Sequence, residues 1–106
     1  MRMSSTKDYL DFVLEQLSGL PDIDYRAMMG EYIIYYRGKV IGGIYDNRFL
    51  VKKTPNAMKI IQNAKMEIPY PKGSPMIMIT DIENRDLLGM LFNVMYDELP
   101  DIKKHR

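Results

Sequence analysis

The strongest constraint on the fold of this chain is a run rich in Tyr, Ile and Val that extends from Tyr25 to Lys53: YRAMMGEYIIYYRGKVIGGIYDNRFLVKK. Two sets of turn residues divide it, one around Gly38 and one at Asp46-Asn47. Aromatic and β-branched residues pack well on a pleated, half-buried surface. The run therefore predicts a meander of antiparallel strands joined by tight turns.

Apolar residues at helical spacing flank this meander. A Leu/Val stripe predicts a helix over 5–19, with Ser5 as its N-cap. A threonine followed by a proline predicts the start of a short helix over 55–64. Asn84 is placed to cap a third helix, whose broad apolar stripe continues to Leu99.

Alternation of apolar and polar residues predicts strands on both sides of the second helix. Pro69 and Pro71 have no N–H for the interior of a sheet, so the strand beside them is expected at an edge. The predicted strands are 24–28, 32–36, 40–45, 49–53, 67–70 and 75–82. This gives an α+β class and a two-layer α/β sandwich, in the order helix, three or four strands, helix, two strands, helix, with an antiparallel sheet.

Length and composition narrow the class of protein. The chain has 106 residues, which suits one domain over 1–106. It has no Cys, so disulfide scaffolds, thiolate metal sites and Cys nucleophiles are excluded. The net charge is +1, from 15 basic and 14 acidic residues, and gives no general attraction to nucleic acid or membranes. With no signal peptide or long apolar run, a soluble, cytoplasmic protein that does not bind membranes is expected.

Residues that carry catalysis are scarce. The single His, His105, lies in a charged tail, where a fixed partner and a pocket are not expected. Asp81, Glu83 and Asp86 lie close together in sequence, but they lack the spacing and the glycine of an EF-hand loop. Neither a Walker A loop nor a dinucleotide-binding glycine motif is present. The sequence therefore predicts no enzyme, no catalytic residues, no cofactor and no metal site.

Basic residues cluster in and beside the meander and interleave with tyrosines. Cationic groups beside exposed aromatic rings on a sheet can bind single-stranded nucleic acid. The same residues also keep a sheet soluble and protect its edges, which is the commoner explanation. The candidates for nucleic-acid binding are Arg26, Lys39, Arg48, Lys52 and Lys53.

Gly42-Gly43 interrupts a predicted strand and requires a structural reason. A β-bulge or a closely packed helix would provide one. The alternative is a small ligand that approaches the backbone there, with Arg26 and Tyr45 beside it. That alternative would make the protein a ligand binder or an enzyme.

The meander carries a pattern that comprises Arg26, Met28, Gly30, Tyr32, Ile34, Tyr35, Gly38, Lys39, Ile44, Asp46 and Lys52. In these residues it resembles the N-terminal domain of the TfoX/Sxy family, bacterial regulators linked to DNA-uptake competence. Met29 and Glu31 depart from the family pattern, which has an aromatic residue and a second glycine there. The resemblance implies a secretion-chaperone-like α/β fold and offers no catalytic residues. Full-length regulators carry a second, helical domain, for which this chain is too short, so a single-domain member is expected.

These observations favour a non-enzymatic regulatory or adaptor domain that acts through protein–protein contacts, including a role in transcription or competence regulation. Ten methionines and a tyrosine-rich sheet suit either an adaptable partner surface or a plastic core. A homodimer is the expected partner mode, since symmetric dimers are the commonest oligomers. The alternatives are a nucleic-acid-binding regulator and a small-ligand binder or enzyme.

Overall fold

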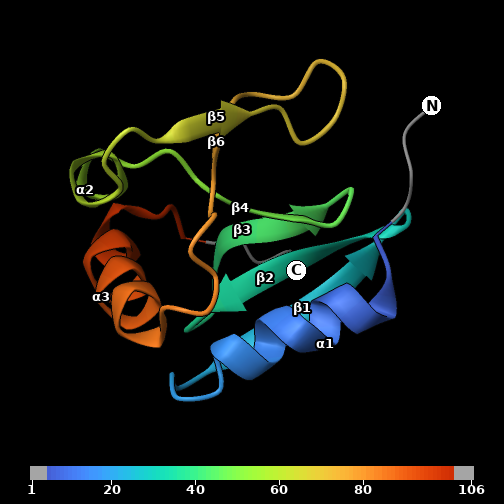
Figure 1. Ribbon diagram of the computed structural model, residues 1–106, viewed down its shortest axis with the longest axis horizontal. Helices are drawn as coiled ribbons and strands as arrows, with labels where there is room; N and C mark the ends of the chain where they lie inside the picture. The colour runs from blue at the N-terminus through green and yellow to red at the C-terminus, as the bar shows by residue number, and fades with distance from the viewer. Residues whose placement is uncertain (1–4, 102–106) are drawn as a thin grey trace.

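A computed structural model describes residues 5–101 as one six-stranded antiparallel sheet with three α-helices (Figure 1). The strand order is β1-β2-β3-β4-β6-β5, so β1 and β5 are the edges. The elements are α1 (Lys7–Gln16), β1 (Ile23–Met28), β2 (Glu31–Tyr36), β3 (Lys39–Tyr45), β4 (Arg48–Val51), α2 (Pro55–Ile60), β5 (Lys65–Glu67), β6 (Met76–Met78), α3 (Arg85–Met95) and the 3₁₀ turn η1 (Tyr96–Glu98). The predicted α+β class and antiparallel sheet are confirmed.

Three two-residue turns connect the first four strands. Each turn places both of its residues at positive φ: Met29-Gly30, Arg37-Gly38 and Asp46-Asn47. This is the type I′ geometry, whose twist matches that of the flanking strands. The predicted turns at Gly38 and Asp46-Asn47 are confirmed, and Met29 adopts the same backbone conformation although it is neither Gly nor Asn.

One side of the sheet holds the hydrophobic core. Figure 1 shows α1 lying along β1 and β2, with α2 and α3 together at one end of the sheet. Ile34, Ile44 and Phe49 point to this side and are fully buried. Helix residues such as Leu10 and Phe92 complete the cluster. The core thus combines helix residues with every second residue of the strands, as the alternation of apolar and polar residues in the sequence predicts.

The opposite side of the sheet, here called the open face, carries the other half of the strand residues. Most of them are partly exposed, although Glu31 and Leu50 are buried, and they lie outside the core cluster. Because the side chains of a strand alternate between faces, this side is formed by a set that includes Ile33, Tyr35, Val40, Tyr45, Arg48, Met76 and Met78.

Several element ends differ from the prediction. Thr6, and not Ser5, caps α1: the Thr6 side chain accepts a hydrogen bond from the Tyr9 N–H. β5 does lie at an edge but ends before Ile68, and β6 is shorter than 75–82. The predicted caps of the other two helices are confirmed, at Thr54 and Asn84.

Gly42 and Gly43, the two glycines within strand β3, are each required by a different close contact. A Cβ on Gly42 would collide with the backbone of Leu50 and Val51 in β4. A Cβ on Gly43 would lie 2.7 Å from the ring of Tyr45, which therefore lies across that glycine. The β2–β3 register also shifts between Ile34 and Tyr35, which is an irregularity of the β-bulge kind, one of the structural reasons considered for the glycine pair.

Candidate functional site

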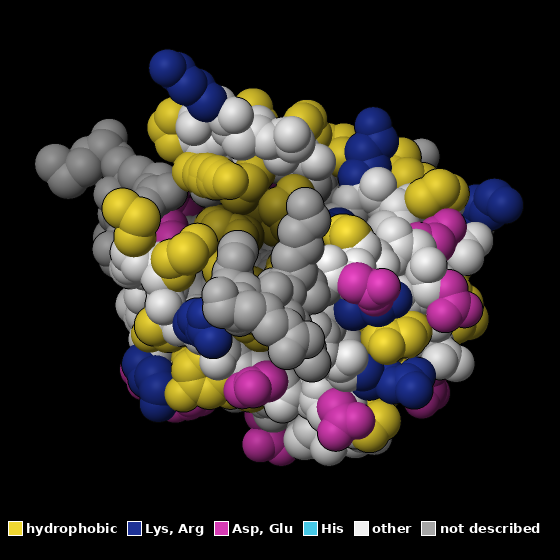
Figure 2. All heavy atoms as spheres, turned by 180° about the vertical axis from the view of Figure 1, so that it is seen from behind, with side chains coloured by type: hydrophobic (Ala, Val, Ile, Leu, Met, Phe, Trp, Pro, Cys, Tyr) yellow, Lys and Arg dark blue, Asp and Glu magenta, His cyan; other side chains and the backbone are white. Residues whose placement is uncertain are grey.

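A groove of about 570 Å³ opens on the open face, between the β3–β4 strands and the loop that joins β5 to β6. Figure 2 shows the molecule from behind, with hydrophobic side chains around a hollow in the upper left of that view, beside this loop. The lining combines apolar and aromatic groups with polar ones, and two lysines add positive charge. The lining residues are Val40, Gly42, Tyr45, Lys52, Lys53, Pro69, Tyr70, Ser74, Pro75 and Met76.

Two tyrosines form an aromatic contact in this groove. The rings of Tyr45 and Tyr70 meet edge to face, with 6.1 Å between their centroids. Burial raises the pKa of the Tyr45 hydroxyl above its usual value, and the nearby Tyr70 and Glu31 raise it further. Tyr45 therefore stays neutral at physiological pH, as a flat apolar surface with one hydroxyl.

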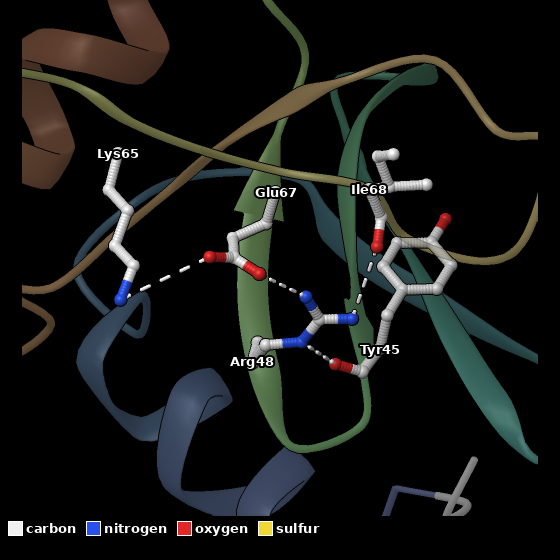
Figure 3. Close-up of polar contacts among 5 residues, drawn as sticks. All are labelled: Tyr45, Arg48, Lys65, Glu67 and Ile68. Carbon is white, nitrogen blue, oxygen red and sulfur yellow. Dashed lines mark hydrogen bonds and ion pairs between the residues drawn. The ribbon is translucent and has the colours of Figure 1, made fainter. Parts of the chain in front are cut away.

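The side chain of Arg48 links the sheet to β5 and to the start of the β5–β6 loop, which forms one wall of the groove (Figure 3). Its guanidinium donates to the Glu67 carboxylate at 2.8 Å, to the carbonyl of Tyr45 at 3.0 Å and to the carbonyl of Ile68 at 3.3 Å. Lys65 lies 4.0 Å from the other oxygen of Glu67. A planar guanidinium that binds three acceptors holds its neighbours in one arrangement, so the groove is fixed in shape.

The predicted basic residues are dispersed over the sheet. Lys52 and Lys53 come together at the groove. Arg48 is bound to Glu67, and Arg26 lies on the edge strand β1, away from the groove. Lys39 belongs to the helix side, where its ammonium lies 4.2 Å from the Tyr96 ring centroid and 3.5 Å from an Asp101 carboxylate oxygen. The structure therefore brings two of the five together in one groove.

The sequence predictions did not include a buried polar cluster at the end of the open face. Glu31 accepts hydrogen bonds from the Ser5 hydroxyl at 2.6 Å and from the Ser5 and Asp46 amides at 3.1 and 3.2 Å. Ser5 in turn accepts from the Asn47 amide. Glu31 stands where the TfoX/Sxy pattern has its second glycine, so this departure has a structural role in joining the N-terminal segment to the β3–β4 turn.

Within residues 5–101, no three acidic or histidine side chains come close enough together to hold a metal ion. No helix there combines the length and the apolar character needed to cross a membrane. His105 lies outside the described residues.

The chain is similar to an uncharacterised bacterial protein. An uncharacterised 12.7 kDa protein in the trpE 5′ region of Spirochaeta aurantia is 33% identical over 69 residues, which are 65% of this chain and 60% of that protein. The match thus spans less than two thirds of the relative. No family model and no solved structure matches the chain. The resemblance to the TfoX/Sxy family stays a prediction drawn from the motif residues.

Proposed function

We propose that this chain is a cytoplasmic, non-enzymatic regulatory or adaptor domain of the TfoX N-terminal type, which acts through protein–protein contacts made by its open face. Competence or transcription regulation is the process that the family resemblance suggests. The observation that supports the proposal is the groove: exposed aromatic and apolar side chains around a fixed hollow on the side of the sheet opposite the core.

The lining of the groove indicates the kind of partner. Tyr45, Tyr70 and two prolines offer apolar surface at a low cost in side-chain entropy, as in many protein interfaces. Lys52 and Lys53 favour a partner segment with carboxylates. We therefore propose that the groove binds an extended acidic segment that also carries apolar residues.

Charge reversal at the two lysines tests this proposal. A Lys52→Glu/Lys53→Glu variant should lose partners that the wild-type chain captures from bacterial lysate, because both charges at the groove change sign. The matched control is Lys7→Glu/Lys59→Glu, which makes the same charge change at exposed positions on helices. Equal capture by the groove variant and the control would overturn the proposal.

Nucleic-acid binding is the second candidate, and the pairing of Lys52 and Lys53 with Tyr45 and Tyr70 favours it. It predicts binding of a single-stranded oligonucleotide that weakens steeply with salt. Charge reversal at the groove should weaken this binding about tenfold or more, whereas reversal at Lys39, on the helix side, should have a small effect. Absence of binding in low salt would exclude this candidate.

A small ligand at Gly42-Gly43 is the third candidate. Gly42 and Tyr45 do line the groove, whereas Arg26, the third residue predicted for this site, does not. A thermal-shift screen of metabolite classes tests it, since a ligand that binds the folded state raises the melting temperature with concentration. Shifts that also occur in a Tyr45→Ala variant would be assigned elsewhere.

A further inference from the structure

The edge strand β1 offers an unpaired edge for a second chain. In residues 5–101, β1 pairs with β2 on one side, and no other strand pairs with it. Five of its six residues are exposed. A hollow of about 810 Å³ borders the strand, lined in part by Asp22, Tyr25 and Arg26. The edge is therefore accessible along its length, which is the arrangement that strand addition uses.

The other edge of the sheet is protected. β5 has three residues, two of them charged, and Pro69 follows shortly after it. Short, charged edges with nearby prolines are the usual defence against unwanted pairing. The contrast between the two edges points to β1 as the side where a partner strand is accepted.

The hairpin geometry determines which backbone groups of β1 point outward. In a two-residue hairpin, the pair that flanks the turn exchanges hydrogen bonds, and this pair is Met28 with Glu31. Alternation along the strand then leaves the N–H and C=O groups of Ile23, Tyr25 and Ala27 directed away from β2. In agreement, the Tyr25 N–H donates to the Asp24 carboxylate at 2.8 Å.

We infer that a second copy of this chain pairs with β1, antiparallel to it, with Tyr25 opposite Tyr25 on the two-fold axis. This register places Asp24 opposite Arg26 of the second copy, and Arg26 opposite its Asp24. Both of these Asp24–Arg26 pairs between the two copies are non-hydrogen-bonded pairs, in which the side chains approach most closely. Ile23 then faces Ala27 on the other side of the strand.

The alternative registers lack this complementarity. A shift that centres the two-fold axis on Asp24 places two carboxylates opposite one another, and a shift that centres it on Arg26 does the same with two guanidinium groups. Like charges directly opposite each other destabilise a strand pair. Within residues 5–101, Asp24 and Arg26 make no ion pair. The Tyr25 N–H, which donates to the Asp24 carboxylate in the single chain, would donate to the backbone of the second copy on pairing and so release that carboxylate for Arg26 of the second copy. Among the registers centred on Asp24, Tyr25 and Arg26, the charge pattern of the strand therefore favours the one centred on Tyr25.

The dimer would be the homodimer that the sequence leads us to expect for a domain of the proposed function. Its interface is the edge strand β1 and does not include the groove lysines, so the dimer and the partner site at the groove can be disproved separately. A single pair of short strands makes a small interface, so we expect a weak dimer whose population rises with protein concentration. Sedimentation velocity over a concentration series measures it.

A charge-swap experiment tests the register. Asp24→Arg and Arg26→Asp should each weaken the dimer about tenfold or more, because each makes two like-charge contacts. The double variant Asp24→Arg/Arg26→Asp should dimerise like the wild type. An equimolar mixture of the two single variants should form a heterodimer, since one then presents two arginines and the other two aspartates.

Circular dichroism of each variant controls for folding, and both positions are exposed. Ala27→Pro provides an independent test, because it removes an outward N–H and should abolish the dimer. A wild-type chain that stays monomeric at about 1 mM, single variants that dimerise normally, or a mixture that stays monomeric would overturn the inference.

Discussion

The hydroxyl of Ser5 donates a hydrogen bond of 2.6 Å to the carboxylate of Glu31, and both residues are buried. This contact spans 26 positions in the sequence and fastens the segment before α1 to the start of β2. The Ser5 amide also donates to the carbonyl of Gly30 at 3.0 Å. The N-terminal segment is therefore part of the sheet's framework at the end where the β3–β4 turn lies.

Replacing Ser5 with Ala should reduce the free energy of unfolding by about 1–3 kcal/mol, because a buried carboxylate loses a charge-assisted donor and the Asn47 amide loses an acceptor. Urea unfolding followed by circular dichroism measures the change. Ser18→Ala, at an exposed position, is the control and should stay within about 0.5 kcal/mol of the wild type. Equal effects of the two substitutions would show that the contact contributes nothing.

Replacing Gly42 with Ala should destabilise the fold strongly, by about 2 kcal/mol or more. The added Cβ would overlap the carbonyl oxygen of Leu50, so strand β4 would have to move. Gly89→Ala, inside α3, is the matched comparison, because its Cβ would lie 3.6 Å from Leu20 Cδ2, an ordinary van der Waals distance. That substitution should stabilise the helix by about 0.5–1 kcal/mol. A tolerated Gly42→Ala would restore the ligand explanation for this glycine.

Replacing Arg48 with Lys should loosen the loop between β5 and β6 while leaving the sheet folded. Lys keeps the charge but cannot reach Glu67 and the carbonyls of Tyr45 and Ile68 together. Hydrogen exchange should speed up in residues 65–75 and stay unchanged in β2. Unchanged exchange in the loop would mean that its shape does not depend on Arg48.

The stability of the protein should fall at alkaline pH in a way that depends on Tyr45. Its pKa is raised in the folded state, chiefly by burial, so the folded state favours the neutral phenol. The stabilisation that the neutral Tyr45 hydroxyl provides is complete below pH about 10, which is the pKa of tyrosine in the unfolded chain. It is lost as the pH rises through the higher pKa that Tyr45 has in the folded state. Tyr45→Phe should flatten this decline.

Burial also raises the pKa of Tyr9, so Tyr9 contributes to the same loss of stability at alkaline pH. The fall in the free energy of unfolding should therefore be smaller in Tyr45→Phe than in the wild type, but not absent. Unfolding free energies measured between pH 8 and pH 11 test this prediction. A wild-type curve that overlays that of Tyr45→Phe would contradict it.

Much of the fold could be predicted because its signals are local. Gly38 and the Asp46-Asn47 pair mark two turns, and Thr54 and Asn84 cap their helices as their positions indicate. Residues that act over long distances gave no such signal. Ser5 was predicted to be a helix cap because hydroxyl residues favour that position, but its partner, Glu31, is remote in sequence, and Thr6 caps the helix instead.

The candidate site was less predictable for the same reason. Arg48 was one of the candidates for nucleic-acid binding, and its contact with Glu67, 19 positions away, depends on how β5 is placed beside β6. Gly42 and Tyr45 were singled out from the glycine pair, but the loop that completes the groove carried only turn and edge-strand signals. Tyr70 was therefore missed, although a tyrosine between two prolines in such a loop is a recognisable candidate for an exposed contact.

Site-specific photocrosslinking in bacterial cells tests the use of the open face most directly. A photoreactive phenylalanine derivative at Tyr70, on the groove, should yield a discrete crosslinked protein that disappears in the Lys52→Glu/Lys53→Glu background. The same probe at Phe12, an exposed aromatic position on α1, should not yield it. Crosslinks that are identical from the two positions, or that persist after charge reversal, would contradict a partner site at the groove.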